Sequence, residues 1–250
     1  MKNLFLLSIL LTTTLHAIVA IKPRVVGDKP GFSGSITASF DTKRGNTETD
    51  NYKGAVKVLY DNNISHLIWG MLSYEYGEAN SVKNTNKIFS HLRYIGLTTI
   101  KNFNKEAYIQ ASDDEFKGIK NRLLAGGGMR YKIFGNDYYG RTYVGMSAYI
   151  EHIIYGNDAI DPTENNVRGN FNLAYQLPLN EDSEFNALAY YQPRVDAPSD
   201  FYSSATIGFQ LHVYLSLFLN FKITHEYDSE PAIGVLKEDI ASSTEFVFKF

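Results

Sequence analysis

The sequence predicts an all-β protein, a transmembrane antiparallel up-and-down β-barrel of about twelve strands, with about ten as the fallback count. Three observations predict it. Segments of alternating apolar and polar residues recur between polar turns, which is the period of a strand with two different faces. Aromatic residues are abundant, with 18 Tyr and 16 Phe against 1 Trp. The closing segment, residues 243–250, places Phe246, Phe248 and Phe250 on one face, which would be an aggregation hazard in water.

The amino-terminal residues 1–20 are predicted to be a signal peptide. Lys2 supplies a positive start, residues 4–11 form an apolar run, and cleavage is expected after Ala17 or Ala20. The apolar run is too short to cross a bilayer as a helix. Residues 21–30 are expected to form a short periplasmic lead. Residues 31–250 are expected to form one barrel domain, because no linker or shift in composition divides them.

The first two expected strands, residues 31–41 and 52–61, show the alternation most simply. In the first, Phe32, Ile36 and Phe40 share one face, opposite serines and a threonine. In the second, Tyr52 and Tyr60 share the outward face and lie roughly 26 Å apart along the strand at about 3.3 Å per residue. A tilted strand brings that separation close to the spacing of two aromatic girdles flanking an apolar band.

Ten further strands are expected, at residues 66–76, 88–100, 107–116, 122–133, 141–155, 167–177, 185–192, 201–211, 217–227 and from 240 onward. In the first of these, Trp69 and Met71 compete with Leu72 and Tyr74 for the outward face. No turn residue separates Leu211 from residue 217, yet a single strand across both segments would be too long. A tight turn without a sequence signal is therefore expected there.

The connections between the expected strands alternate in length. Short ones follow residue 60 and occupy residues 102–105, 134–137 and 178–183. Longer polar ones occupy residues 77–86, 156–165, 193–200 and 228–235. Short periplasmic turns and longer external loops would produce this pattern in a barrel.

Several classes of function are disfavoured by composition and spacing. The chain has no cysteine, which excludes disulfides and Cys-ligated metals. A net charge of −3 without a basic stripe argues against a nucleic-acid partner. Gly126, Gly127 and Gly128 lie within an expected strand and are not followed by the Lys-Ser/Thr of a phosphate loop, so they favour close approach of strands.

The histidines give no clear catalytic or metal-binding pattern. No His is followed two positions later by Ser, the one-face spacing of a membrane-embedded serine hydrolase, although a nonlocal arrangement stays open. Glu151-His152 and His225-Glu226 are adjacent pairs, and adjacent residues of a strand point to opposite faces. We therefore expect no catalytic residue, no metal site and no cofactor.

Charged residues of the predicted inward face are the remaining signal. Two hypotheses stay open, namely a narrow pore with a mild preference for anions and a lumen closed by cross-strand ion pairs. No long hydrophobic loop is available as a plug. The expected lumen-lining residues are Lys53, Lys57, Arg93, Asp114, Arg122, Arg130, Lys132, Arg168, Lys222 and Glu226.

Three segments together resemble a known family. Residues 41–52, residues 106–131 and the aromatic closing segment are similar to the salt-induced outer-membrane protein family, which is defined by a domain of unknown function. The most specific parts of the resemblance are Gly45-Asn46-Thr47 and the stretch from Asp114 through Arg122 to the three glycines at residues 126–128. The resemblance implies a barrel in the bacterial outer membrane, and no activity, substrate or catalytic residue.

The row of Phe246, Phe248 and Phe250 also resembles the carboxy-terminal signature that the barrel-insertion machinery recognises in outer-membrane barrels. The expected partners are therefore outer-membrane lipids and that machinery, with the oligomeric state left open. We expect a non-enzymatic outer-membrane barrel that passes small solutes like a porin or serves an osmotic or salt response. The alternatives are a closed structural or surface-interaction barrel and, third in order, a lipid-modifying hydrolase.

Overall fold

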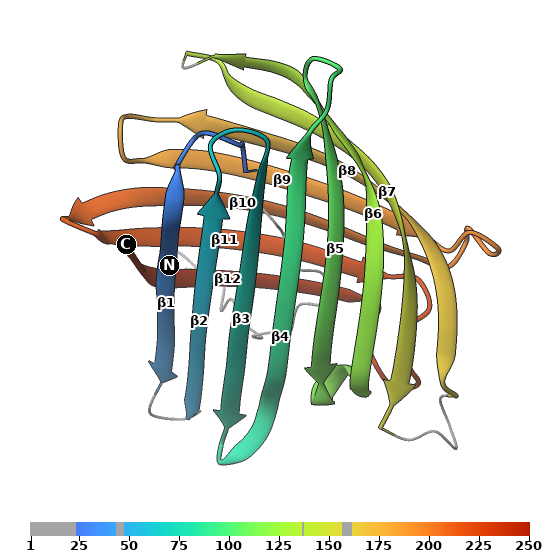
Figure 1. Ribbon diagram of the computed structural model, residues 1–250. Helices are drawn as coiled ribbons and strands as arrows, with labels where there is room; N and C mark the ends of the chain where they lie inside the picture. Colours follow the sequence, from blue (N-terminus) through green and yellow to red (C-terminus); the bar gives the residue numbers. More distant parts are fainter. Residues whose placement is uncertain (1–23, 44–47, 137, 157–161) are drawn as a thin grey trace, which may run out of the picture.

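The computed structural model describes residues 24–43, 48–136, 138–156 and 162–250. The predicted signal peptide and the Gly45, Asn46 and Thr47 stretch lie outside these residues. Strands β1 to β12 form a closed antiparallel barrel in which sequence neighbours pair and β12 returns to β1 (Figure 1). The strands are β1 (Gly31–Lys43), β2 (Thr49–Asp61), β3 (His66–Ala79), β4 (Val82–Leu97), β5 (Phe103–Asp114), β6 (Ile119–Asn136), β7 (Gly140–Tyr155), β8 (Glu164–Pro178), β9 (Glu184–Pro193), β10 (Phe201–Tyr214), β11 (Leu217–Asp228) and β12 (Glu238–Lys249).

The prediction of twelve strands is confirmed, including the turn that carries no sequence signal. β10 ends at Tyr214 and β11 begins at Leu217, so only two residues connect them. Leu215 there has a φ of +50°, in the left-handed region where a side chain is unusual. The fallback count of ten strands is therefore wrong, because residues 201–228 form a hairpin rather than one strand.

The two ends of the barrel differ in their connections. We call the end where β1 starts and β12 finishes the near end, and the opposite one the far end. Near-end turns occupy residues 62–65, 98–102, 137–139, 179–183 and 215–216, and far-end connections occupy residues 44–48, 80–81, 115–118, 156–163, 194–200 and 229–237. The far end thus carries the three longest connections.

One expected long loop, residues 77–86, is instead mostly strand. β3 continues to Ala79 and β4 begins at Val82, leaving Asn80 and Ser81 as a two-residue turn. Their φ values of +49° and +62° are those of a type I′ turn, whose twist matches the flanking strands. The prediction of a loop there was wrong because polar residues continue the ladder outside the apolar band.

Inward and outward faces alternate along each strand as expected for a barrel. Leu72 and Tyr74 are 53% and 49% exposed, whereas Trp69 is 1% exposed and points into the barrel. This settles the face of β3 that the sequence left ambiguous. The outward face is rich in apolar and aromatic side chains, and most buried polar and charged side chains point inward.

Outward aromatic side chains contact one another near both ends of the strands. Toward the near end the pairs are Phe32–Tyr60, Phe103–Tyr131 and Phe185–Phe209, and toward the far end they are Tyr191–Phe201 and Phe201–Tyr227; Phe40 and Phe246 stack beside the seam between β1 and β12. Two belts separated by aliphatic residues are the arrangement in which a barrel meets the two interfaces of a bilayer. Among the described residues, no helix is long and apolar enough to cross a membrane.

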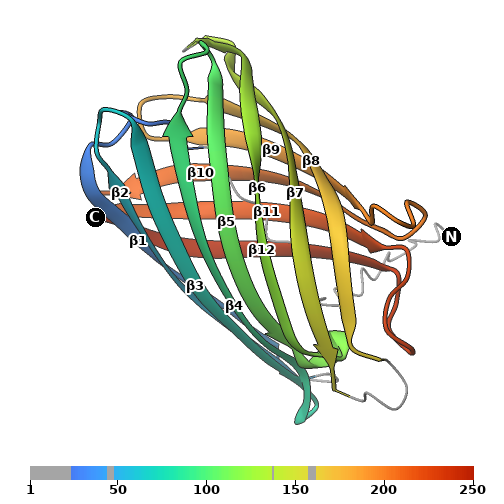
Figure 2. The ribbon, with the colours of Figure 1, turned by 45° about the vertical axis from the view of Figure 1, so that its right-hand side comes forward.

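The seam between β1 and β12 is short. Its ladder has four residue pairs, from Ser35–Lys249 to Ala38–Phe246, whereas β1 and β2 form thirteen. Two further backbone hydrogen bonds join Gly34 and Phe250, at 2.8 and 3.0 Å. In both ribbon views the two strands meet at the near end and diverge toward the far end (Figures 1 and 2).

Candidate functional site: the barrel interior

The expected periplasmic lead reaches into the near-end mouth of the barrel. We use "the lead" for residues 24–30. Arg130 Nη2 donates to the carbonyl of Arg24 at 2.6 Å, the amide of Gly27 donates to Asp61 Oδ2 at 2.7 Å, and Asp28 pairs with Arg141 at 2.6 Å. These contacts fix the lead to β2, β6 and β7 from inside.

Two neighbouring valines of the lead attach it to the apolar parts of the wall. Val25 packs on a buried cluster that includes Tyr143 and Leu188, and Val26 packs on one that includes Leu59 and Trp69. Sequence reasoning predicted a short periplasmic lead here but missed its contacts with the inner wall of the barrel. Its only signal is the Val-Val pair, which is too short to show any periodicity.

A chamber of about 600 Å³ occupies the near half and the middle of the barrel. Its walls are the inner faces of β1–β4 and β8–β12, together with the lead and the turn at residues 179–183. Apolar side chains and charges of both signs share these walls. Besides residues of the lead and the near-end turns, the wall includes Leu59, Trp69, Phe89, Phe218, Lys53, Lys57, Lys87, Lys222, Lys249, Glu75 and Glu245.

An ion-pair bridge crosses the floor of this chamber under the seam. Lys53 on β2 pairs with Glu75 on β3 at 3.0 Å and with Glu245 on β12 at 3.2 Å. Lys222 on β11 also pairs with Glu245, at 3.0 Å, and Asn220 donates to the same carboxylate at 2.9 Å. The bridge therefore connects β2 to β12 past β1, where the backbone ladder is missing.

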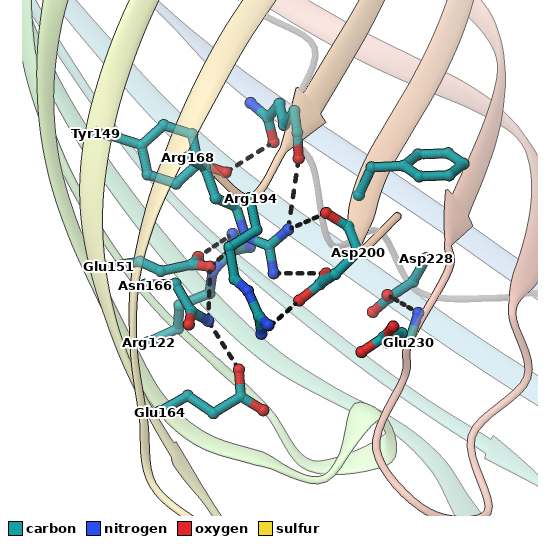
Figure 3. A network of polar contacts seen from close by, with 12 residues as sticks. Arg122, Tyr149, Glu151, Glu164, Asn166, Arg168, Arg194, Asp200, Asp228 and Glu230 are labelled. Carbon is teal, nitrogen blue, oxygen red and sulfur yellow. Dashed lines mark hydrogen bonds and ion pairs between the residues drawn. The ribbon is translucent and has the colours of Figure 1, made fainter. Parts of the chain in front are cut away.

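The far half of the barrel contains a buried ion network centred on Glu151 (Figure 3). Arg122 donates to its carboxylate from Nε at 2.9 Å and from Nη2 at 2.6 Å, and Arg168 donates from Nε. Arg168 also pairs with Asp200 at 2.9 Å, and Arg194 pairs with the other oxygen of Asp200 at 2.9 Å. The network ties β6, β7 and β8 to the far-end loop at residues 194–200.

Tyr202 supports this network from β10. The Arg168 guanidinium lies 4.0 Å from the centre of its ring, and the Arg122 guanidinium lies 4.8 Å away. Arg168 and Glu151 are 1% and 3% exposed, so the charges are shielded from solvent. Buried, mutually satisfied charges of this kind hold neighbouring elements in one arrangement.

Further ion pairs lie nearer the two ends. At the far end, Lys117 pairs with Glu226 at 3.2 Å and with Asp239 at 3.0 Å. Burial alone would lower the pKa of the Lys117 ammonium, but these two carboxylates outweigh it and its pKa lies above the ordinary value. Toward the near end, Glu106 pairs with Arg93 at 2.9 Å and with Arg130 at 3.2 Å.

The structure places the ten expected lumen-lining residues on inward positions but does not gather them into one ring. Four are half-buried, namely Lys53, Lys57, Lys132 and Lys222, and six are buried, namely Arg93, Asp114, Arg122, Arg130, Arg168 and Glu226. The arginines are held in ion pairs, so they are structural charges rather than free charges of an open pore. Lys53, Lys57 and Lys222 face the chamber.

The three glycines of β6 act by letting two strands approach. A Cβ at Gly128 would lie 2.2 Å from the Met146 carbonyl oxygen, and one at Gly126 would lie 2.6 Å from the Tyr149 Cβ. Gly126 also lies against the Tyr108 ring, whose hydroxyl is 3.0 Å from Ser147 Oγ. These positions belong to the β6–β7 ladder rather than to a ligand loop.

Two kinds of contact among the described histidines and acidic residues bear on reactivity and metal binding. Ser65 Oγ lies 3.1 Å from His66 Nδ1, but Ser65 belongs to an exposed near-end turn and His66 is the half-buried first residue of β3. The Asn62 side chain caps that turn by accepting from three backbone amides. Within the described ranges, no group of three or more His, Cys, Asp or Glu could hold a metal ion.

A family model described as a protein of unknown function, DUF481, matches residues 36–250. No curated protein matches the chain. Among solved structures, an outer-membrane channel from Pseudomonas putida F1 is similar with a TM-score of 0.58 and 10% identity, covering 92% of this chain and 100% of that one. The NanC porin gives 0.48 and 9%, with 88% and 98% covered, and the KdgM porin gives 0.46 and 7%, with 87% and 98% covered. At these identities the likeness shows the fold alone, which is that of outer-membrane barrels.

Proposed function

This chain belongs to the DUF481 family of proteins of unknown function, and from that premise we propose that it is an outer-membrane barrel that passes small solutes through a constricted lumen. The observation that supports this best is the chamber of about 600 Å³, which extends from the near-end turn at residues 179–183 to the middle of the barrel. A barrel with a purely structural role could have its interior filled by side chains and would need no such space.

The lumen is narrowed at two levels, which predicts weak conduction. The lead occupies part of the near-end mouth, and the Glu151 network fills part of the far half. The lead is held by a few polar contacts and two valines, whereas the network is buried and multiply bonded. Displacement of the lead is therefore the easier route to a wider passage.

The proposed location of the protein is the outer membrane. The predicted signal peptide directs export, the outward aromatic belts meet outer-membrane lipids, and the row of Phe246, Phe248 and Phe250 is read by the insertion machinery. No reaction and no cofactor are assigned to the protein. A role in the response to osmotic stress or salt rests only on the resemblance of this sequence to the salt-induced outer-membrane protein family.

Planar-bilayer recording of the purified barrel tests the proposed function. We expect small conductance steps for the wild type and larger or more frequent steps when residues 24–30 are removed. The matched control, Ile64→Ser in the exposed near-end turn, should behave as the wild type does. Lys57→Glu should move the reversal potential toward cations, and 1 M salt should weaken any ion preference because screening shortens to about 3 Å.

A closed structural barrel is the second candidate, and the Glu151 network is the observation that favours it. If neither the wild type nor the variant without the lead conducts above the bare bilayer, passage of solutes is wrong and the closed barrel replaces it.

A further inference from the structure

A row of three side chains crosses the seam inside the chamber. Ser35 on β1 is in register with Lys57 on β2 and, on its other side, with Lys249 on β12. Adjacent strands lie about 4.8 Å apart, so the two lysine backbones are roughly 10 Å apart with a serine between them. All three residues line the chamber.

Each lysine of this row lies over an aromatic ring. Lys57 Nζ is 4.2 Å from the centre of the Trp69 ring, and Lys249 Nζ is 3.7 Å from the centre of the Phe218 ring. The rings are 1% and 7% exposed and form part of the chamber wall. Positive charge and apolar surface are thus combined in one place, which suits a ligand with both an anionic group and an apolar body.

The chamber also needs hydrogen-bond acceptors. Among the described residues that line it, the buried side-chain nitrogen and oxygen atoms without a hydrogen-bond partner are Arg24 Nε, Trp69 Nε1 and Lys87 Nζ. All three are donors. Lys87 has Asp114 Oδ2 at 3.6 Å, close enough for an ion pair but too far for a hydrogen bond. Buried donors are normally satisfied, so a ligand that brings acceptors would complete this wall.

We propose that the chamber is a binding site for small organic anions that carry a carboxylate on an apolar body. The carboxylate lies between Lys57 and Lys249, close to Ser35, and the body lies against the apolar chamber wall to which Trp69 and Phe218 belong. A cavity of about 600 Å³ is in the size range of small-molecule sites. The inference rests on the proposed function only in naming the solute class, because binding itself requires no passage.

Trp69 is the one tryptophan of the chain, so its emission reports directly on this site. The folded protein in zwitterionic detergent is titrated with 4-phenylbutyrate and, in parallel, with the uncharged 4-phenylbutanol. We expect a saturable change in emission with the acid and no saturable change with the alcohol. Combining Lys57→Gln with Lys249→Gln should weaken binding of the acid roughly tenfold or more, because charge-assisted hydrogen bonds are lost.

The matched control removes the same charge elsewhere. Lys101 and Lys120 are exposed and do not line the chamber, so Lys101→Gln with Lys120→Gln should leave the titration unchanged.

The anion site is wrong if acid and alcohol act alike or if the double lysine variant binds as the wild type does. If the lysine variant does not fold, the comparison of acid with alcohol on the wild type decides. Saturable binding without conductance would overturn the proposed function and keep this site. Conductance without saturable binding would overturn the anion site and keep the proposed function.

Discussion

Replacing Glu151 by Ala tests whether the far-half network holds the barrel together. Glu151 is the carboxylate shared by Arg122 and Arg168, and its side chain is 0% exposed. Its removal leaves two buried guanidinium groups without their common partner. Arg168 keeps its ion pair with Asp200 at 2.9 Å, so part of the network survives.

The expected loss in the free energy of unfolding is about 3 kcal/mol, at the lower end of the range for breaking a buried ion pair from one side. That is more than a hundredfold in the folding equilibrium, since about 1.4 kcal/mol is tenfold. A solvent-exposed ion pair with the same nitrogen-to-oxygen distance supplies the comparison. Lys83 and Glu115 also meet at 2.6 Å, as Arg122 and Glu151 do, but their side chains are 40% and 45% exposed. Because solvent screens such pairs, Glu115→Ala should leave stability almost unchanged.

Urea unfolding of the lipid-embedded barrel, followed by Trp69 emission, measures both variants. Trp69 lies outside the network, so its signal reports global unfolding rather than the local change. Glu151→Gln keeps the shape of the side chain and should lose less than Glu151→Ala. If Glu151→Ala and Glu115→Ala shift the transition equally, burial does not decide the strength of these pairs and the reasoning fails.

Three further predictions concern topology and assembly. With the near end in the periplasm, a cysteine at Leu236 should react with an impermeant thiol reagent on intact cells and one at Ile64 should not. The opposite labelling would show that the far end faces the periplasm. Gly128→Val should abolish the folded band that shifts on heating in gels, because a Cβ there would meet the Met146 carbonyl oxygen at 2.2 Å. Gly54→Val should fold, because a Cβ at Gly54 would have nothing within 4 Å. Equal yields of folded protein would contradict a close approach of β6 and β7. Deleting Phe250 should lower the yield of folded barrel without blocking export, because the deletion removes two backbone hydrogen bonds to Gly34. An unchanged yield would show that the seam closes without these two hydrogen bonds.

Much of the barrel was predictable because its outward face must be apolar and its inward face need not be. This period of two, together with the limit on strand length that placed the turn after Leu211, located the twelve strands, with every bound except the start of β4 within four residues. It failed at Trp69, where an inward aromatic residue competes with outward ones, and at residues 77–86, where polar strand ends look like a loop. Beyond the apolar band no lipid contacts the strand, so its outward residues need not be apolar and the alternation that identifies a strand disappears.

The interior was harder to predict, because its pairs depend on contacts between distant strands. Face assignment placed Lys53 inside, but its contact with Glu245 at 3.2 Å requires β12 to return beside β1 in one particular register. The Lys57–Ser35–Lys249 row depends on the same closure. The lead was missed for another reason: its two valines stabilise it only after the barrel exists to receive them.

The short seam separates the folding of this barrel into two kinds of step. Each of the other eleven ladders joins strands that are consecutive in the sequence, so each can form as a local hairpin across a short connection. The seam joins residues some two hundred positions apart, as in the bond from Ser39 Oγ to the Thr244 carbonyl, which spans 205 residues. Such closure has the largest entropic cost and slows folding most. Until it occurs the chain is a curved sheet with two open edges, and its exposure time, hence its risk of pairing with another chain, is governed by the rate of that one event.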